Sequence, residues 1–468
     1  MAFTEFYVTQ DVLASYLNGG SGTAGPKENT TALNNIDAVS IDGTYYTLEN
    51  KDNDGWGTTA VDDFGLWDVA GTKERFRVVE LNYGADADVI RIIKMTAITA
   101  DTGKTVNIGG AWEALEDSGN GPANFITTSF VNAAGDPPRV NIGPGTYAEE
   151  VTIANTGTVA IPLTFEGYYA TTGDECDNSG TFDPPIIEGQ AASDHTIIAG
   201  AGIDYLRIRN LKITAQTNAK DCINADTDAS FFDRLWLKTT GTTADGLLNA
   251  GNFNVYSDSY VESVTGGGLS VGIYAEVRNC YIRKADTYGI SVGAFSAIDG
   301  CIVEDVVNDC ILITNYRVGV HGCTLYSSTG GSGIKINNAY RGISVTNTIF
   351  DTMNQYAIEA VASCFITEAN NAIRTASMGV GTRLNILSDP IGEVNHTADP
   401  FTNAAGHDFS LNSAATGGTL LKATGFPGTM LDGTNIGYRD IGALQSALPT
   451  DEEIAQSIWE YANRTLTG

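Results

Sequence analysis

The chain has 468 residues, 53 of them glycine, and a formal net charge of −30, from 26 Lys plus Arg and 56 Asp plus Glu. This length exceeds one ordinary globular core, so we expect several domains or one elongated repeat body. Abundant glycine favours turn-rich β structure. The negative charge argues against a nucleic-acid partner, because phosphates would be repelled over most of the surface.

The amino-terminal residues 1–38 are rich in Gly, Asn and Thr and lack periodicity. This pattern predicts an attachment arm that becomes ordered against another protein, with Phe6 and Tyr7 as candidate anchors. The chain opens without a basic segment and apolar run, and it contains no stretch of about 18 apolar residues. We therefore expect synthesis in a cytoplasm and no membrane span.

Residues 39–120 contain runs in which apolar and polar side chains alternate, for example at 76–79 and 89–93. Such alternation is typical of strands with one face buried. It predicts a small antiparallel β domain. This domain lacks the repeat of the following region and is therefore a separate unit.

A short repeat marks the middle of the chain, where pairs of a small and an apolar residue recur at steps of 22, 21, 21, 23 and 24 residues. These pairs are Gly246-Leu247, Gly268-Leu269, Gly289-Ile290, Cys310-Ile311, Gly333-Ile334 and Ala357-Ile358. A second series keeps the same phase: Asp258-Ser259, Asn279-Cys280, Gly300-Cys301, Gly322-Cys323 and Ser363-Cys364. Units this short must stack to bury an apolar face. They predict a right-handed parallel β-helix over residues 121–395, with about eleven coils after residue 143.

The seven cysteines form no Cys-x-x-Cys pair. Cys280, Cys301 and Cys323 share one coil position, which predicts an inward ladder of buried thiols in preference to a metal or redox site. The four histidines lack the spacing of a chelating pair. We expect no metal site and no cofactor.

The carboxyl-terminal part changes pattern twice. Residues 396–447 are expected to cap the open edge of the last coil. Residues 448–468 are predicted to form a short helix and tail, with Thr450 and Glu453 as a capping box. This helix either packs on the end of the β-helix or forms an oligomer contact, and the candidate attachment residues in it are Trp459, Tyr461 and Arg464.

Three short motifs carry a resemblance to known proteins. The run Pro144-Gly145-Thr146-Tyr147-Ala148-Glu149 resembles the opening coil of right-handed β-helix families, which include pectin-active enzymes and viral spikes. The ending from Trp459 to Thr467 resembles the tail of phage structural proteins, and FYVTQ and VNIGGAW look like the amino-terminal region of β-helical virion proteins of tailed phages. The resemblance implies a tailspike, head fibre or capsid decoration protein on the virion surface. It also implies capsid or tail proteins as partners and a homotrimer.

Chemistry on such a fold needs a group of side chains on one face, typically paired carboxylates. Carboxylates near coil corners are weak catalytic candidates: Glu262, Glu276, Asp299, Glu304 and Asp305. Their proximity either serves hydrolysis or reflects the abundance of acids. Tyrosines near turns either stack on sugars or pack the corners: Tyr274, Tyr288, Tyr316 and Tyr326.

Two functions remain open at this stage. The first is a non-enzymatic virion surface protein that attaches by its terminal regions and projects a β-helical rod for host-surface binding or particle stabilisation. The alternative is a tailspike depolymerase, a hydrolase or lyase that cleaves host surface polysaccharide. The absence of a compact catalytic set in the sequence favours the first.

Overall fold

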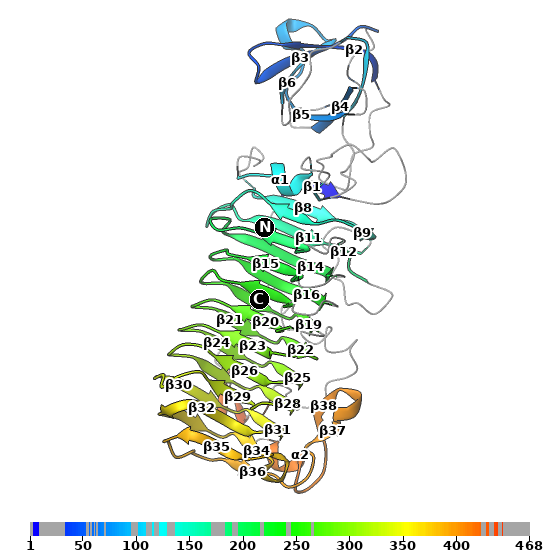
Figure 1. Ribbon diagram of the computed structural model, residues 1–468. Coiled ribbons are helices and arrows are strands. Elements are labelled where there is room, and N and C mark those ends of the chain that lie inside the picture. Colours follow the sequence, from blue (N-terminus) through cyan, green and yellow to red (C-terminus); the bar gives the residue numbers. More distant parts are fainter. Residues whose placement is uncertain are drawn as a thin grey trace. The chain divides into compact units, whose positions relative to one another are not determined.

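The computed structural model describes residues 3–8, 33–52, 56, 59, 61, 64–69, 72–94, 102–108, 115–116, 121–128, 136–169, 183–189, 195–215, 220–239, 245–263, 266–422, 427–429, 435–438 and 442. The described chain is all-β: a parallel β-helix of about nine turns with a small antiparallel barrel (Figure 1). The predicted fold class is therefore confirmed. The turns are fewer than expected because the register steps range from 21 to 26 residues: Leu269 pairs with Ile290, but Ile197 pairs with Ile223.

The chain divides into two compact units. The first comprises Met1–Cys176, Pro184–Ile186 and Tyr205–Arg207, and the second comprises Asp177–Asp183, Ile187–Asp204 and Ile208–Gly468.

A closed antiparallel barrel lies in the first unit, with strand order β2-β3-β6-β5-β4-β7. Its strands are β2 (Leu33–Ser40), β3 (Tyr45–Asn50), β4 (Phe64–Val69), β5 (Thr72–Glu80), β6 (Val89–Lys94) and β7 (Lys104–Ile108), with a 3-10 turn η2 (Tyr83–Ala85). Alternating side chains such as Leu48, Phe76 and Ile90 point inward and are fully buried. The barrel begins at Leu33, so its first strand uses residues that the sequence assigned to the arm.

The first unit also holds the opening coil. Its elements are β1 (Thr4–Val8), α1 (Pro122–Phe125), β8 (Pro138–Ile142), β9 (Thr146–Tyr147), β10 (Val151–Ile153) and β11 (Leu163–Gly167). Strand β1 pairs in parallel with β8 and brings Phe6 opposite Val140 and Tyr7 opposite Asn141. Phe6 and Tyr7 are 1% and 0% exposed. These two predicted anchors are therefore core residues of the opening coil, and burial keeps both side chains off the surface.

The second unit is a β-helix with three parallel ribbons, which we call faces A, B and C. Face A consists of β18 (Val255–Ser257), β21 (Glu276–Arg278), β24 (Ala297–Asp299), β27 (Gly319–His321), β30 (Ile343–Thr346) and β33 (Ile366–Ala369). Face B consists of β19 (Tyr260–Ser263), β22 (Tyr281–Arg283), β25 (Ile302–Val306), β28 (Thr324–Ser328), β31 (Ile349–Met353), β34 (Ala372–Ile373) and β36 (Val394–Asn395). The longer β16 (Phe231–Thr239) pairs with both β18 and β19.

Face C consists of β13 (Ile197–Ala199), β15 (Ile223–Ala225), β17 (Leu247–Asn249), β20 (Leu269–Val271), β23 (Tyr288–Val292), β26 (Asp309–Ile313), β29 (Ile334–Ile336), β32 (Tyr356–Cys364) and β35 (Gly381–Ile386). The small-apolar pairs of the repeat lie here in register, and their apolar members, such as Ile290 and Ile311, are fully buried. The small member is needed because a Cβ on Gly289 would lie 2.3 Å from Val303 Cγ1 of face B. The core thus forms where side chains of the faces meet.

The corner between faces A and B explains the second sequence series. Its residues adopt positive φ: Asp258, Asn279, Gly300, Gly322, Asn347 and Asn370. Asp, Asn and Gly tolerate this left-handed conformation best. Cys280, Cys301 and Cys323 follow these residues and are free and buried, as the ladder interpretation predicts, and burial raises the pKa of the Cys301 thiol. Cys364 was misaligned, because the corner continues through Asn347 and Asn370 while Cys364 ends β32.

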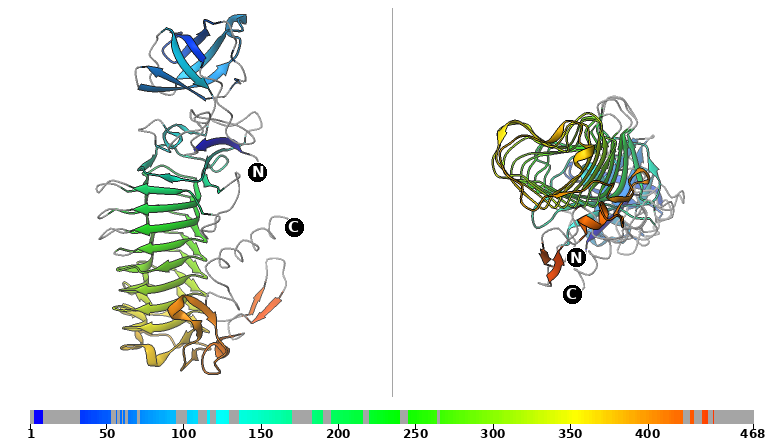
Figure 2. Two further views of the ribbon diagram at one scale, coloured as in Figure 1. Left: turned by 90° about the vertical axis from the view of Figure 1, so that its right-hand side faces the viewer. Right: turned by 90° about the horizontal axis from the view of Figure 1, so that it is seen from below.

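The carboxyl-terminal segment corrects another expectation. Its described elements are β37 (Phe401–Asn403), η5 (Ala404–Gly406), β38 (Asp408–Leu411), α2 (Gly418–Leu421), β39 (Pro427–Thr429) and β40 (Asn435–Tyr438). Phe401 and Phe409 pack on Ile302 and Ile349, so the segment covers the outer side of face B (Figure 2) instead of only the last coil's edge. Apolar side chains point outward from face B there and need this cover. The predicted helix at 448–468 lies outside the described residues.

Candidate acid/base site on face C

One outward position on face C gathers polar side chains from successive coils. The strand register aligns Ile197 with Ile223, Ile223 with Leu247, and Leu247 with Leu269. Counting two residues back from each places one column of residues on the outer side. We call this set the polar column: His195, Asp221, Asp245, Gly267, Tyr288 and Asp309.

Each aspartate of the polar column uses one carboxylate oxygen to hold the next coil. The backbone N–H of Asp245 donates to Asp221 Oδ1 at 2.8 Å, and that of Gly267 donates to Asp245 Oδ1 at 2.6 Å. The N–H of Ser332 likewise donates to Asp309 Oδ1 at 2.9 Å. These bonds fix the carboxyl groups and leave their Oδ2 atoms for other partners. A rigid support of this kind is what a catalytic carboxylate needs.

The second oxygen of Asp221 faces a histidine. Its Oδ2 lies 3.1 Å from His195 Nδ1 and 3.4 Å from Asn224 Nδ2, which is itself 3.0 Å from His195 Nε2. Burial raises the pKa of Asp221, although the hydrogen bond from the Asp245 backbone and the nearby His195 act in the opposite direction. A carboxyl group with a raised pKa keeps its proton into a higher pH range, as a general acid requires.

Asp245 has a different environment. The hydroxyl of Tyr288 donates to Asp245 Oδ2 at 2.8 Å, across the coil that carries Gly267. A Cβ at Gly267 would lie 2.2 Å from the Tyr288 ring, so glycine there lets the ring cross to Asp245. Burial raises the pKa of Tyr288, which keeps its hydroxyl protonated as a donor. The two neighbouring aspartates therefore have distinct partners, one a histidine and the other a phenol.

Sequence reasoning missed His195, Asp221 and Asp245, and it named Tyr288 only as a sugar-stacking candidate. The histidine was set aside because it has no chelating neighbour in sequence. A usable signal existed: each of these residues lies two positions before the apolar member of a repeat unit, as in Asp221-Cys222-Ile223 and Asp245-Gly246-Leu247. Aligning that position over all coils would have found the column.

Two of the predicted carboxylates, Glu262 and Glu304, lie on the outer side of face B. The register places Glu262 opposite Arg283, and Arg283 opposite Glu304, so a cation separates the two acids. Burial opposes ionisation of Glu262, but Lys238 and Lys284 dominate and lower its pKa. The Nζ of Lys284 lies 3.3 Å from Glu262 Oε1. Glu262 is thus neutralised by neighbouring coils.

Glu304 lies beneath the carboxyl-terminal segment and its side chain is 1% exposed. His407 Nδ1 is 2.8 Å from Glu304 Oε1, Arg283 Nε is 3.4 Å away, and the Tyr281 hydroxyl donates to the same oxygen. Burial raises the pKa of Glu304, while Tyr281 and His407 reduce that effect. The chain's own groups occupy this carboxylate, so a substrate has no access to it in this structure.

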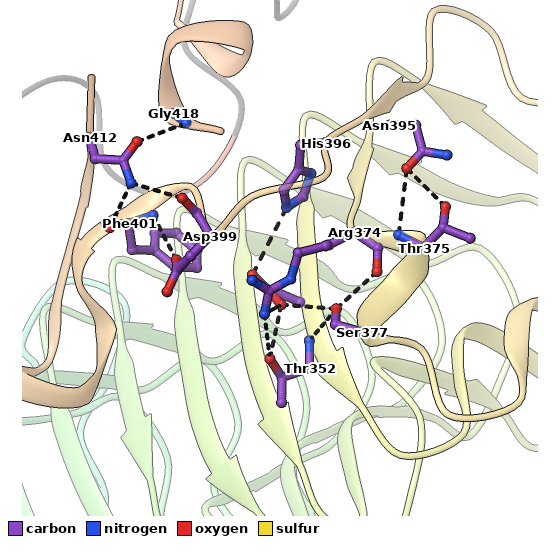
Figure 3. A network of polar contacts seen from close by, with 11 residues as sticks. Thr352, Arg374, Thr375, Ser377, Asn395, His396, Asp399, Phe401, Asn412 and Gly418 are labelled. Carbon is purple, nitrogen blue, oxygen red and sulfur yellow. Dashed lines mark hydrogen bonds and ion pairs between the residues drawn. The ribbon is translucent and has the colours of Figure 1, made fainter. Parts of the chain in front are cut away.

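A second buried acid of face B, Asp351, anchors the network in Figure 3. Arg374 Nη2 lies 2.6 Å from Asp351 Oδ1, and Thr352 and Ser377 both donate hydroxyl hydrogen bonds to that oxygen at 2.9 Å. His396 Nε2 is 3.9 Å from Asp351 Oδ2, and both side chains are fully buried. The network ties the last coils to the start of the carboxyl-terminal segment, which gives it a structural use.

The structure does not bring the remaining candidate acids together. Glu276 and Asp299 belong to face A, and Asp305 occupies a positive-φ corner after face B. Tyr326 packs edge-on against Phe401 and Phe409, so its ring serves the core under the carboxyl-terminal segment. The attachment candidates Trp459, Tyr461 and Arg464 lie outside the described residues.

Tyr274 and Tyr316 belong to an exposed stack at the corner between faces C and A. We call it the aromatic corner: Phe253, Tyr274, Phe295 and Tyr316. Phe253 and Tyr274 stack at 4.6 Å between centroids, Tyr274 and Phe295 at 4.7 Å, and Phe295 meets Tyr316 edge-on at 5.1 Å. Both faces of the Tyr274 ring therefore contact other rings. Phe253, Tyr274 and Tyr316 are still 58%, 41% and 43% exposed.

The backbone of the aromatic corner is strained. Phe253, Tyr274 and Phe295 have φ of +58°, +56° and +58°, where bulky residues are outliers. This conformation costs about 1–2 kcal/mol for each such residue, whereas each ring pair contributes only about 0.5–1.5 kcal/mol. Stacking therefore roughly offsets the strain and adds little net stability. The corner between faces A and B, with Asp, Asn and Gly, avoids this cost.

Two searches over the described residues bear on other site types. No group of three or more His, Cys, Asp or Glu side chains there is placed to hold a metal ion. None of the helices in the described part of the chain is both long and apolar enough to cross a membrane.

Comparison with protein-family models and with curated protein sequences finds no match. Solved structures show distant likenesses. The pectate lyase Pel9A is 11% identical over 66% of this chain and 88% of its own, with a TM-score of 0.41. A tailspike protein of Acinetobacter baumannii bacteriophage Fri1, a capsular polysaccharide depolymerase, is 11% identical over 73% and 69%, with a TM-score of 0.40. An α-1,3-glucanase catalytic domain is 13% identical over 80% and 98%, with a TM-score of 0.32. At this identity the likenesses concern architecture alone.

Proposed function

We propose that face C binds and cleaves a polysaccharide by hydrolysis, and that the chain does so on the surface of a tailed-phage particle. The in-register pair Asp221 and Asp245 carries the cleavage proposal. Adjacent strands lie about 4.8 Å apart, close to the ~5–5.5 Å that separates the two carboxyl groups of retaining glycosidases. Their environments also differ, which is the usual mark of distinct acid and nucleophile roles.

The roles follow from the partners. Asp221, with its raised pKa, donates a proton to the glycosidic oxygen as the bond from that oxygen to the anomeric carbon breaks. Asp245, held by Gly267 and Tyr288, bonds to the anomeric carbon through its carboxylate. Water then attacks that carbon, Asp221 accepts its proton, and the bond to Asp245 breaks. The sugar is released with retained configuration.

The direct test is incubation of the full chain with a panel of purified bacterial capsular polysaccharides and lipopolysaccharides. We expect shortened chains and new reducing ends from at least one of them, and proton NMR of the first product should show retention. Asp245→Asn should lower the rate by about 10²-fold or more. No shortening of any polysaccharide, or an unchanged rate in Asp245→Asn, would contradict the proposal.

The particle location rests on the sequence resemblance of the opening coil and the tail to phage virion proteins. It predicts contacts with capsid or tail proteins and synthesis in the host cytoplasm. Mass spectrometry of purified particles checks this directly, and absence of the chain would end it. A homotrimer follows from the same resemblance, and light scattering that gives the single-chain mass of 49.4 kDa would remove it.

A non-enzymatic surface protein is the second candidate, and one observation favours it. Asp309 makes the same bond to the next coil as Asp221 and Asp245, and its Oδ2 faces Lys335 at 3.8 Å. An aspartate at this position thus has a structural use of its own. Under this alternative the rod binds the host surface or stabilises the particle without cleaving anything.

A further inference from the structure

The aromatic corner does not take part in the proposed hydrolysis, and its strained backbone needs an explanation other than stability. Exposed backbone outliers often mark functional positions. Here three successive coils keep a large ring where Asp, Asn or Gly would fit without strain, as they do at the corner between faces A and B. Exposed rings in a strongly acidic protein favour an interaction surface.

The shape of the aromatic corner favours a thin partner. The rings form a single column over four coils, one side chain wide. A stable protein interface uses about 20–30 residues on each side, so a second copy of the chain would find too little surface here. A linear polysaccharide is itself a narrow chain. Phe253 ends the stack next to Ala229, which has no ring, and it is the most exposed member at 58%.

Charge selects among polysaccharides. Arg317 continues the corner with φ of +57°, and its guanidinium lies 5.2 Å from the Phe295 ring centre. Arg341 lies on the next coil, where its carbonyl accepts the Arg317 N–H, and both side chains are exposed. In the part of the chain that the structure describes, neither guanidinium pairs with a carboxylate. Two available cations on a protein of net charge −30 form a local site for anions.

We propose that the aromatic corner, continued by Arg317 and Arg341, binds a linear polysaccharide that carries carboxylate groups. Sugar rings lie on the open face of Phe253 and along the exposed ring edges, and the guanidiniums pair with the carboxylates. The site is separate from the polar column and shares only the ligand class with the proposed hydrolysis. It would hold a long chain on the rod while another part of that chain reaches face C.

Affinity electrophoresis of the full chain in gels that contain alginate, polygalacturonate or dextran tests the proposal. The double substitution Phe253→Asn and Tyr274→Asn removes two rings and keeps residues that tolerate positive φ. We expect the wild type to be retarded by a uronate gel and the double variant to bind about tenfold more weakly or worse, with an unchanged or higher Tm. Phe365→Asn, which removes another exposed ring, is the control and should migrate as the wild type.

Two further variants separate the parts of the proposal. Arg317→Gln with Arg341→Gln should remove retardation in the uronate gels. Asp221→Asn should keep it, because that residue belongs to the polar column, so failure of hydrolysis and failure of this site give different results. Equal migration of the wild type and the double aromatic variant in every gel would overturn the proposal. Retardation by dextran as strong as by the uronates would overturn the role of the two arginines.

Discussion

Faces B and C of the β-helix carry similar acidic side chains but use them differently. On face B, Glu304 and Asp351 are 1% and 0% exposed, and arginine and histidine side chains of the chain itself surround them. On face C, Asp221 is 10% exposed and holds the next coil with only one oxygen. The difference teaches that the number of acids on a face says little. What covers them, and which oxygen remains for a ligand, decides their role.

The inner side of face C should be the most sensitive part of this comparison. Ile290 is fully buried in the central column, so Ile290→Asp places an unpaired charge in the core and removes apolar packing. We expect a loss of about 4–5 kcal/mol or more in the free energy of unfolding. Denaturant unfolding followed by circular dichroism measures it. Thr287→Asp, on the exposed turn before the same strand, is the control and should change little; equal midpoints would contradict the inward assignment.

The buried pair on face B should come next. Removing Arg374 leaves Asp351 charged and fully buried, which costs about 3–5 kcal/mol. Arg278→Ala breaks the exposed pair with Glu276, whose side chains are 47% and 44% exposed, and should cost about 0–1 kcal/mol. Urea unfolding of both variants gives the comparison. Equal losses would mean that the network of Figure 3 does not anchor the last coils.

The smallest expected effect is a pH dependence on face B. Burial raises the pKa of Glu304 above its ordinary value of 4.5, so the folded chain binds this proton more tightly than the unfolded chain. The resulting stability is complete below pH 4.5 and is lost as pH rises through the raised folded value. Glu304→Gln removes this loss. The Tm difference, variant minus wild type, should therefore grow between pH 4 and pH 7; a constant or falling difference would contradict it.

The repeat made the fold predictable because sequence spacing and strand register are the same quantity in a β-helix. Gly289-Ile290 and Cys310-Ile311 predicted their own pairing. The cover of face B was not predictable, since it depends on contacts of Phe401 and Phe409 with strands about a hundred residues earlier. The site on face C was missed for a related reason. His195 and Asp221 are 26 residues apart, and only the register places them together.

The contrast between Asp221 and Asp309 tests the central claim most directly. Both occupy the polar column, both hold a backbone N–H of the next coil, and burial raises the pKa of both. Asp221→Asn and Asp309→Asn should therefore change the Tm similarly. On a polysaccharide that the wild type shortens, we predict that Asp221→Asn lowers kcat by about 10²–10⁴-fold while Asp309→Asn stays near the wild type. Equal rates in the two variants would show that the column serves only to hold the coils together.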